Sequence, residues 1–500
     1  MPTETVYGLC ADALNEAAVQ KIFKAKGRPA DNPLIVHISD LSQIEDLSYG
    51  LPEGALKLTE KFWPGPLTVI VKKKSTVPDI TSGGLSTVAI RFPKNPVIKK
   101  VMELSGCVIA APSANISGSP SPTNFKHVKE DMFGRIDAIV DGGDCEIGVE
   151  STVVSFVDDT PRILRPGGVT AEQIKEILPD VIIDKGVYSS VKKALSPGMK
   201  YKHYAPKAEV YLINAKSSVF CNFVNRENIA ALCLKEDEQK LSVPYVSLGE
   251  KPEKNLFSAL RTLDEKGFKT VAAHAPNLEG VGLAVYNRLI RSCGFKTINL
   301  PVIIGLTGPS GAGKTMAANT AEGLGFYHID CDRFASSIVS SQLEELAAVF
   351  GKKIQNGNKL NKKALARIAF SSKENTEALN KITLPAIKAA LKEEITKLNK
   401  PYILLDGATI FEAGAENLCD AVIAVTADMH LRKERIIKRD GLSEADAMLR
   451  LSASKSEDFY KEKTPYVIKN NGDINEFLQN FTNTLKKFMK DIKKDEKDGH

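Results

Sequence analysis

The stretch VIIGLTGPSGAGKT, residues 302–315, decides the fold of the C-terminal part of the chain. It contains a complete GxxxxGK[ST] motif, with an apolar strand before the glycines and a helical segment, MAANTAEGLG, after them. Glycines in such a loop let backbone N–H groups turn inward around a phosphate, and the next helix presents the positive end of its dipole. The pattern therefore predicts a P-loop domain with a parallel sheet that binds a nucleoside triphosphate.

The sequence after this motif narrows the choice of phosphate acceptor. The segments HIDCDRFA, LNKITLPAI, YILLDGATIFEAG and RKERIIKRDGLSEADAMLRLSAS make residues 300–485 similar to the dephospho-CoA kinase family. The resemblance implies ATP-dependent phosphorylation of dephospho-CoA, with Asp332 beside the ribose hydroxyl that attacks the γ-phosphate. A carboxylate in that place can orient or deprotonate an alcohol while the loop and Mg²⁺ neutralise the phosphoryl charge.

Side chains of the loop and of the segments after it are expected to contact ATP and Mg²⁺. Lys314 is expected to reach the β- and γ-phosphates, and the Thr315 hydroxyl to ligate Mg²⁺. Asp406 ends the apolar strand YILL and resembles the second Mg²⁺ ligand of such sites, while Arg439 lies on a basic helix that resembles a lid. The expected ATP contacts are Gly308, Gly311, Ala312, Gly313, Lys314, Thr315 and Arg439, and the expected catalytic residues are Lys314 and Asp332.

Three positions depart from the usual pattern of that family. The chain has Leu384-Pro385 where His-Pro is usual, Ser454 where Gln is usual, and Gly-Ala-Thr after Asp406 in place of Ala-Pro-Leu. We interpret these differences as changes on the acceptor side rather than in the ATP cradle. A P-loop kinase with a different acceptor therefore stays open as an alternative.

The N-terminal part of the chain has a different pattern, in which polar clusters stand at the ends of apolar strands. Strands are expected at 67–71 (LTVIV), 108–111 (VIAA) and 136–140 (IDAIV), alternating with helices in a mixed α/β domain. Small hydroxyl residues stand beside Lys and Arg in several clusters. Such side chains suit anion binding, because hydroxyls donate hydrogen bonds and the cations offset phosphate or carboxylate charge.

Taken together, the clusters resemble a known family. The stretches PTETVYG (2–8), KGRPADNPL (26–34) and APSANISG (111–118) follow the order and wording of the YrdC-like threonylcarbamoyl-AMP synthases. The Lys-x-Arg and Ser-x-Asn signatures of that family fall on Lys26/Arg28 and Ser113/Asn115. The segment SPGMKYKHYAP (196–206) and the domain after it resemble the long form of the family, so that the likeness covers residues 1–300.

The resemblance implies a mixed-sheet α/β domain that condenses three substrates. Threonine and bicarbonate, or CO₂, form a carbamate that attacks the α-phosphate of Mg²⁺-bound ATP and releases pyrophosphate. The product serves threonylcarbamoyladenosine formation in tRNA by other proteins. Lys26 and Arg28 are the expected catalytic cations, with Lys26 facing the phosphates. The expected threonine contacts are Thr5, His37, Arg91, Ala111 and Ser151, and the expected ATP contacts are Arg28, Asn32, Thr87, Ser113, Asn115, Ser121, Arg165 and Tyr204.

These patterns divide the chain into five parts. We predict a synthase-like domain at 1–183, a linker at 184–207, a small parallel α/β domain at 208–300, the P-loop domain at 301–488 and a charged tail at 489–500. Members of the synthase family usually have a strand and a helix before PTETVYGL. We therefore expect either a sheet that lacks this strand or a sequence that starts late.

Composition sets the outer limits of these interpretations. The 500 residues are 43% hydrophobic and 26% charged with a net charge of +6, which excludes a chain that is mainly disordered and argues for about three domains. No apolar run approaches a membrane span, and the eight cysteines stand singly without a CxxC pair, so we expect a cytoplasmic protein with reduced thiols and no membrane partner.

Two alternatives for the N-terminal half remain at this stage. It could be an RNA-binding platform that uses basic residues such as Lys72–Lys74 on phosphates, although it lacks the aromatic residues among basic ones that stack on single-stranded RNA. It could also be an inactive remnant of a synthase. Direct contact with tRNA is left open.

Overall fold

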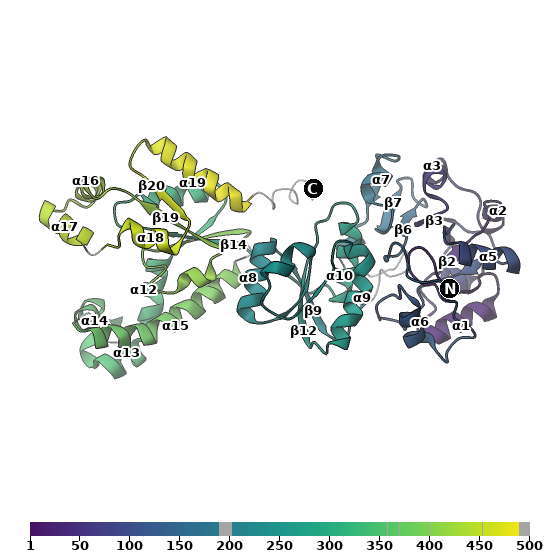
Figure 1. Cartoon of the computed structure of the whole chain (residues 1–500), viewed down its shortest axis with the longest axis horizontal. Helices are drawn as coiled ribbons and strands as arrows, with labels where there is room; N and C mark the ends of the chain where they lie inside the picture. The colour runs from purple at the N-terminus through teal and green to yellow at the C-terminus, as the bar shows by residue number, and fades with distance from the viewer. Residues whose placement is uncertain (190–202, 358, 370, 399, 453, 490–500) are drawn as a thin grey trace. The chain divides into compact units, whose positions relative to one another are not determined.

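The computed structural model describes residues 1–189, 203–357, 359–369, 371–398, 400–452 and 454–489. The chain forms two compact units, Met1–Ile298 and Asn299–His500, and each is described by itself (Figure 1). Most of the predicted linker and almost all of the predicted tail lie outside the described residues. Both units are α/β folds, as the sequence predicts.

The N-terminal half of the first unit is built on one mixed sheet of eight strands, in the order β1-β5-β2-β4-β3-β6-β7-β8. Three neighbouring pairs, β2–β4, β3–β6 and β7–β8, are parallel, and the other pairs are antiparallel. The strands are β1 (Ala11–Asp12), β2 (Ile35–His37), β3 (Leu67–Lys72), β4 (Thr87–Arg91), β5 (Ile109–Ala110), β6 (Thr152–Ser155), β7 (Arg162–Arg165) and β8 (Ile182–Ile183).

The two faces of this sheet differ in what they carry. On one face Val36, Val69 and Ile90 join the main hydrophobic core. On the other face Ile35 and Ala89 belong to a small apolar cluster, and two residues further along each strand the side chains become polar. Because alternate residues of a strand share a face, His37 and Arg91 lie beside each other on that second face, with Thr68 next to them.

Seven helices accompany this sheet, and the first of them places a predicted site residue. Helix α1 begins after Asn15, whose side chain accepts a hydrogen bond from the Ala18 N–H, and it ends at Gly27 with φ of +63°. Its apolar side packs into the main core and leaves Lys26 in the last turn. The helices are α1 (Glu16–Lys26), α2 (Gln43–Leu47), α3 (Glu53–Phe62), α4 (Asp79–Ser82), α5 (Pro96–Ser105), α6 (Phe125–Met132) and α7 (Ala171–Lys175).

Two of the three predicted strands of this domain are confirmed. The stretch 67–71 lies in β3, and the stretch 108–111 contains β5. The prediction for 136–140 is wrong, because no strand forms there. Ile136 and Ile139 are half-buried against the main core, so their apolar character reflects packing of an irregular segment rather than sheet formation.

The second half of this unit is the predicted small α/β domain. Its five strands have the order β11-β10-β12-β9-β13, and β9 to β12 run parallel. The strands are β9 (Glu209–Asn214), β10 (Ala230–Cys233), β11 (Tyr245–Ser247), β12 (Thr270–His274) and β13 (Thr297–Asn299), and the helices are α8 (Ser217–Glu227), α9 (Pro252–Glu265) and α10 (Gly282–Ser292).

Helices α9 and α10 pack against the N-terminal domain. The backbones approach closely at Gly148, because a Cβ atom built on it would stand 2.4 Å from Cα of Lys254 in α9. Arg261 of α9 donates to both carboxylate oxygens of Asp131 in α6, at 3.2 and 2.7 Å. Val6 and Val149 belong to the hydrophobic core of the small domain. The two domains of this unit therefore share a tightly fitted interface.

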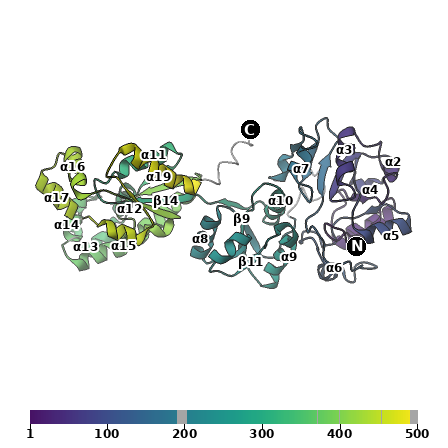
Figure 2. The same cartoon turned by 45° about the horizontal axis from the view of Figure 1, so that its top comes forward.

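The second unit is the predicted P-loop domain. Its main sheet has five strands, all parallel, in the order β15-β18-β14-β19-β20. Helices α15 and α19 lie on opposite sides of it (Figures 1 and 2). The strands are β14 (Val302–Thr307), β15 (Tyr327–Asp330), β18 (Tyr402–Asp406), β19 (Ala421–Thr426) and β20 (Tyr466–Lys469), with a separate hairpin of β16 (Gln355–Asn356) and β17 (Lys359–Leu360).

The helices of this unit lie on both sides of the sheet, and some of them form a small separate lobe. Leu346, Phe350 and Leu365 form a core of their own in that lobe, between α13, α14 and the start of α15. The helices are α11 (Lys314–Gly323), α12 (Cys331–Ser341), α13 (Leu343–Phe350), α14 (Lys362–Ala369), α15 (Lys373–Lys397), α16 (Met429–Asp440), α17 (Glu444–Ser452), α18 (Glu457–Lys463) and α19 (Ile474–Met489).

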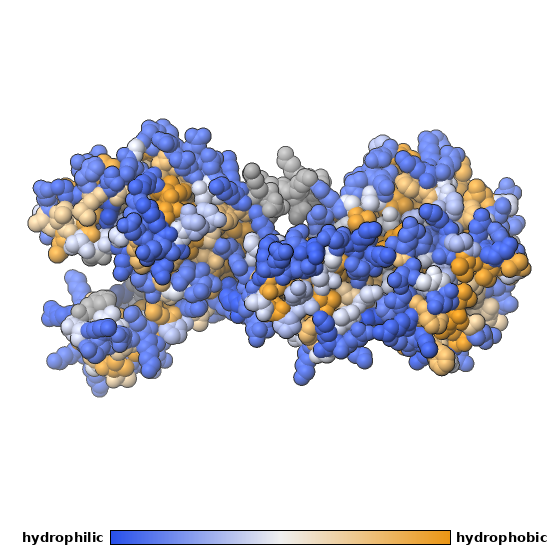
Figure 3. Space-filling view, viewed as in Figure 1, coloured by the Kyte–Doolittle hydropathy of each residue, from blue (hydrophilic) through white to orange (hydrophobic). Residues whose placement is uncertain are grey.

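Hydrophilic and hydrophobic residues are mixed on the face of the molecule seen in Figure 3. Within the described residues, no helix combines the length and the apolar character that a membrane crossing requires.

The close approach at Gly148 gives a test of the interface between the two domains of the first unit. We expect Gly148→Ala to lower the stability of this unit by about 3 kcal/mol, because the methyl group meets the backbone of α9 and φ of +87° strains any other residue. Gly134→Ala is the matched control, since Gly134 has φ of +75° but open space around it, and should cost only about 1 kcal/mol. Urea midpoints of the full chain measure both, and equal losses would contradict the tight fit.

Candidate active sites

A pocket lies over the polar end of the second sheet face in the N-terminal domain. Side chains from β2, β4 and β7 meet there with loops from distant parts of the sequence. The lining residues are Thr5, Val6, Arg28, Leu34, Ile35, His37, Arg91, Ala111, Pro112, Ser113, Glu150, Ser151, Arg165, His203 and Tyr204. All five predicted threonine contacts are among them, together with four of the predicted ATP contacts.

Arg91 is held firmly at one side of this pocket. It is 4% exposed and forms an ion pair with Glu4, while its second terminal nitrogen donates to Oγ1 of Thr5 at 2.9 Å. Burial alone would raise the pKa of Glu4, but the charge and hydrogen bond of Arg91 hold this pKa below its ordinary value. Glu4 is therefore ionised at neutral pH, and the loop before β1 is tied to the end of β4.

Ser151 and Arg165 form a second anchored pair. Arg165 donates to the Ser151 hydroxyl and to its carbonyl oxygen, both at 3.1 Å. The Ser151 hydroxyl also lies 2.7 Å from the Thr68 hydroxyl. Because Arg165 is 7% exposed and Ser151 fully buried, these contacts fix both side chains before any ligand arrives.

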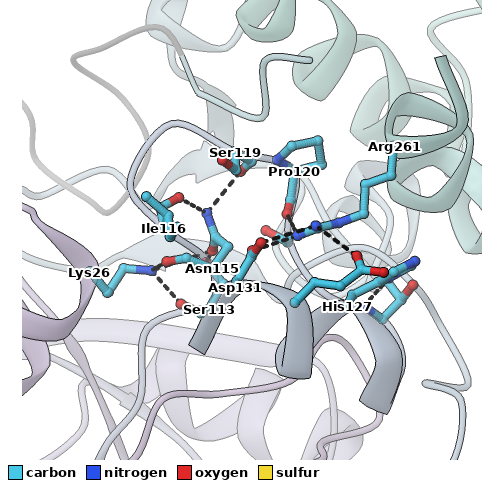
Figure 4. A network of polar contacts seen from close by, with 12 residues as sticks. Lys26, Ser113, Asn115, Ile116, Ser119, Pro120, His127, Asp131 and Arg261 are labelled. Atoms are coloured by element: carbon cyan, nitrogen blue, oxygen red, sulfur yellow. Dashed lines mark hydrogen bonds and ion pairs between the residues drawn. The ribbon is translucent and has the colours of Figure 1, made fainter. Parts of the chain in front are cut away.

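Lys26 is placed beneath the Ser113–Asn115 turn rather than in the pocket wall (Figure 4). Its ammonium donates to the carbonyl oxygens of Ser113 and Asn115, the latter at 2.8 Å, and to Oδ1 of Asn115 at 3.4 Å. The Ser113 hydroxyl donates to the same Oδ1 at 2.6 Å. Burial, helped by the charge of Arg28, lowers the pKa of Lys26 to about 7. The expectation that Lys26 faces the phosphates has no support in this geometry, in which Lys26 holds the turn.

Two polar atoms of the predicted ATP contacts have no hydrogen-bond partner among the described residues. They are Nε of Arg28 and Oδ1 of Asn32, both buried. A terminal nitrogen of Arg28 donates to the Asn32 carbonyl at 3.3 Å, which places the two residues side by side. Buried polar atoms are nearly always paired in folded proteins, so these two indicate room for a polar ligand.

The charges around the pocket favour an anion. Burial, together with neighbouring cations, lowers the pKa of His37 to about 3 and that of His203 to about 4, so both rings are neutral at pH 7. The lining holds three arginines, Arg28, Arg91 and Arg165, and one carboxylate, that of Glu150. Nδ1 of His37 lies 3.2 Å from the Ile35 carbonyl, and in the tautomer in which Nδ1 carries the proton and donates to this carbonyl, Nε2 is an acceptor.

Four of the predicted ATP contacts lie outside the lining. Asn115 and Ser121 stay connected to it, because Asn115 bonds Ser113 and the Ser121 hydroxyl donates to Glu150 at 2.7 Å. Asn32 neighbours Arg28, as described above. Thr87 is the exception, since it begins β4 four residues before Arg91, about 13 Å away along the strand.

Sequence reasoning missed three ionisable residues of this site. Glu150 and His203 line the pocket without having been assigned a role, and Arg288 of the small domain contacts Glu150. Arg288 stands one helical turn after Ala284 and beside Leu289, on the apolar side of α10. A charged residue on the buried face of an amphipathic helix is the signal that would have singled it out.

The second site is the phosphate loop between β14 and α11. The Lys314 ammonium donates to the Gly308 carbonyl at 2.8 Å, and burial lowers the pKa of this lysine although Asp406 and Asp332 act in the opposite direction. A Cβ atom at Gly308 would stand 2.0 Å from the Val425 carbonyl oxygen. The loop is therefore closed tightly by glycine, with the lysine folded across it.

The predicted carboxylates gather at the carboxyl ends of β15 and β18. Burial raises the pKa of Asp406, an effect that Lys314 and His328 partly offset. Asp332 is exposed in the first turn of α12, and Thr315 is exposed in the first turn of α11. Mg²⁺ bound with a nucleotide takes one or two carboxylates and the phosphates, and a carboxylate with a hydroxyl is a suitable oxygen donor set for it.

The basic helix α16 reaches the loop through a residue other than the predicted one. Arg432, which is 6% exposed, donates to the Ser310 carbonyl at 2.9 Å and to the Ser454 hydroxyl at 2.8 Å. Arg439 is half-exposed and pairs with Asp440. Ser454, one of the departures from the kinase family, thus acts on the ATP cradle through Arg432, in contrast to our interpretation from the sequence.

Asn470 supports the loop from below. It is 2% exposed, and its side-chain nitrogen donates to the Ala312 carbonyl at 2.8 Å. Arg435 donates to the Asn470 carbonyl at 2.9 Å. A Cβ atom at Gly313 would stand 2.3 Å from the Asn470 amide nitrogen, so the third glycine of the loop makes room for this side chain.

Comparisons with known proteins identify a family for each part of the chain. The family model described as "Telomere recombination", which covers Sua5, YciO and YrdC proteins, matches residues 1–167. The C-terminal domain of threonylcarbamoyl-AMP synthase matches residues 169–294, and dephospho-CoA kinase matches residues 302–476. The predicted resemblances to these two families are confirmed.

Curated relatives and a solved structure cover the first unit. The threonylcarbamoyl-AMP synthase of Pyrococcus abyssi is 45% identical over 314 residues, which are 60% of this chain and 91% of that protein. The synthase of Bacillus subtilis is 46% identical over 310 residues, or 59% and 89% of the two chains. The crystal structure of P. abyssi Sua5 complexed with L-threonine superposes with a TM-score of 0.55 at 44% identity, covering 60% of this chain and 91% of that one.

The contact between Asn470 and the loop gives a test of the second site. We expect Asn470→Ala to raise the KM for ATP in phosphoryl transfer about tenfold, because one hydrogen bond that shapes the loop is lost. Asn471→Ala is the control, since the exposed Asn471 side chain accepts from the Asp428 N–H and has no described contact with the loop. Initial rates at varied ATP decide the matter, and similar KM values for both variants would show that the loop keeps its shape unaided.

Proposed function

Because the chain belongs to the threonylcarbamoyl-AMP synthase family, we propose that its N-terminal pocket condenses ATP, L-threonine and bicarbonate or CO₂ to threonylcarbamoyl-AMP and pyrophosphate. The product would serve threonylcarbamoyladenosine formation in tRNA by other proteins. The observation that carries the proposal is the pocket itself, where Arg28, Arg91 and Arg165 meet two neutral histidines. The threonine bound to P. abyssi Sua5 supports the choice of amino acid.

The arrangement suits a reaction that depends on positioning. A carbamate oxygen attacks the α-phosphorus of ATP, and the bond to the β-phosphate breaks as pyrophosphate leaves. The arginines offset the negative charge of the nucleotide and of the leaving group. Nε2 of His37 accepts a hydrogen bond from the threonine hydroxyl or amino group in the tautomer whose Nδ1 donates to Ile35. Mg²⁺ would enter with ATP and share its phosphate charge.

The second unit carries a dephospho-CoA kinase domain, for which we propose the matching activity. The γ-phosphoryl group of ATP would pass to the ribose hydroxyl of dephospho-CoA, with Asp332 receiving or orienting the hydroxyl proton. Lys314 would offset charge on the β- and γ-phosphates. Thr315 and Asp406 would hold Mg²⁺, which supplies further charge neutralisation at the transferred group.

Lys26 and Arg28 give a direct test of the synthase reaction. We expect Lys26→Ala and Arg28→Ala to reduce threonine-dependent pyrophosphate release at least a hundredfold. The first variant leaves the carbonyls of the Ser113–Asn115 turn without a donor, and the second removes a pocket cation. Lys24→Ala is the control, because Lys24 is exposed on the same helix. Near-parental rates in the first two variants would place the reaction elsewhere.

Lys314→Ala separates the two proposed activities. It should abolish ATP-dependent phosphorylation of dephospho-CoA, because the ammonium that neutralises the β- and γ-phosphates is gone. Threonylcarbamoyl-AMP synthesis should stay within about twofold, since the N-terminal pocket has its own arginines. Both activities are measured on one purified preparation. Loss of both would contradict two independent sites, and a parental chain that never phosphorylates dephospho-CoA would point to a different acceptor.

A further inference from the structure

Glu150 connects the synthase pocket to the small domain. Its carboxylate lines the pocket, and the two oxygens are bound from different sides. Oε1 accepts from the Ser121 hydroxyl at 2.7 Å, within the N-terminal domain. Oε2 accepts from Nε of Arg288 at 3.0 Å, and Arg288 belongs to α10 of the small domain. A wall of the pocket therefore depends on a residue from outside its own domain.

Arg288 holds more than the carboxylate. It is fully buried, and one terminal nitrogen donates to the Pro166 carbonyl and, at 3.3 Å, to the Ala284 carbonyl of its own helix. Glu150 comes just before β6, and Pro166 just after β7. One guanidinium thus spans the ends of two neighbouring strands. Those ends carry Ser151 and Arg165, which line the pocket and bond each other.

The pair is costly to separate because both charges are buried. An ionised group taken out of water is stable only with a close opposite charge or several hydrogen bonds. Burial raises the pKa of Glu150, but the charges of Arg288 and Arg165 hold it below its ordinary value. The ionisable groups that act on Glu150 or feel its charge are Arg288 of α10, Arg165 of β7, Lys26 of α1, and His203 and Tyr204 of the segment before β9.

We propose that Arg288 is a positioning residue of the synthase reaction, by which the docked small domain holds Glu150 in the pocket wall and sets Ser151 and Arg165 toward the substrates. This inference rests on the proposed synthase function. It assigns the small domain a part in that reaction through one side chain, beyond its packing against the N-terminal domain.

Single and double variants of the full chain test the proposal. All of them carry Lys314→Ala, so that the kinase domain does not hydrolyse or transfer phosphate from ATP during the assay. We expect Arg288→Met to lower kcat/KM for ATP about fiftyfold, because Glu150 loses the hydrogen bond and the charge of Arg288 and keeps only the charge of Arg165 nearby. Asn287→Ala is the matched control. Asn287 is the neighbour on α10, is 1% exposed and donates to the Val187 carbonyl at 2.7 Å, so its loss weakens docking without touching Glu150. Equal losses in the two variants would overturn the proposal.

Charge removal at Glu150 distinguishes positioning from general damage to the fold. Glu150→Gln alone leaves Arg288 unpaired and should also lose activity. The double variant Arg288→Met/Glu150→Gln removes both members of the hydrogen-bonded pair and so holds no buried carboxylate that has lost its donor; we expect it to be about tenfold more active than Arg288→Met. A double variant no better than the worse single variant would overturn the proposal.

The pH dependence of kcat/KM gives a further test, because a variant that only destabilises the fold would not show the change described here. In Arg288→Met the pKa of Glu150 should rise, because burial is then less well offset. Protonation of Glu150 at low pH removes its buried negative charge. The ratio of parental to variant kcat/KM should therefore fall as pH is lowered from about 8 to about 6. The double variant has no carboxyl group at position 150, so any change in its ratio over this range measures the titration of Lys26, whose pKa of about 7 also responds to Glu150, and serves as the baseline. A constant ratio in Arg288→Met itself would overturn the proposal.

Binding experiments keep this inference separate from the proposed function. Calorimetric titration of ATP into the same variants measures affinity without product formation. If the parent binds ATP but releases no pyrophosphate, the proposed function fails, while the affinities of Arg288→Met, Asn287→Ala and the double variant still decide whether Arg288 shapes the pocket. If the parent makes the product and Arg288→Met matches Asn287→Ala in both assays, only the present inference fails.

Discussion

Buried guanidinium groups at the polar end of one sheet face each require an acceptor, and this requirement organises the N-terminal pocket. Arg91 meets Glu4 and Thr5, Arg165 meets Ser151, and Arg288 meets Glu150. A buried cation without such partners would be strongly unfavourable, so every loop that supplies an acceptor is held where the cation stands. The segments around residues 4, 91, 150–165 and 288 are separate in sequence, and ion pairs and hydrogen bonds join them at this place.

The phosphate loop of the second unit is governed by a different constraint, the close approach of backbone segments. Gly308 and Gly313 have φ of +138° and +111°, and a side chain on either would collide with Val425 or Asn470. Backbone N–H groups can then converge on a phosphate without any side chain between them. Lys314 contributes a single side-chain charge to this loop, whereas the N-terminal pocket is lined by several arginines.

This contrast explains how much could be predicted from the sequence. The phosphate loop is a contiguous motif with a backbone reason for each glycine, so its strand, loop and helix follow from residues 302–323 alone. The N-terminal site is dispersed, and only the resemblance to a family gathered its residues. Even so, tertiary packing determines three features that the resemblance did not provide. They are the burial of Lys26, the place of Glu150 in the pocket wall and the contact of Arg288 with Glu150. The predicted strand at 136–140 is wrong for the same reason, since Ile136 and Ile139 pack against the core without forming a strand.

The phosphate loop and the N-terminal pocket each suit the bond that the reaction proposed for that site breaks. Transfer of a γ-phosphoryl group needs charge neutralised at the end of the triphosphate, which a loop wrapped around the β- and γ-phosphates provides. Attack at the α-phosphorus expels pyrophosphate as one unit, so positive charge must be spread along the nucleotide and fixed relative to the amino acid. Arginines held rigidly by buried partners meet that need, because they are positioned before the substrates bind and do not have to reorganise during the reaction. The small domain belongs to this arrangement through Arg288, since one of the rigid partners depends on it.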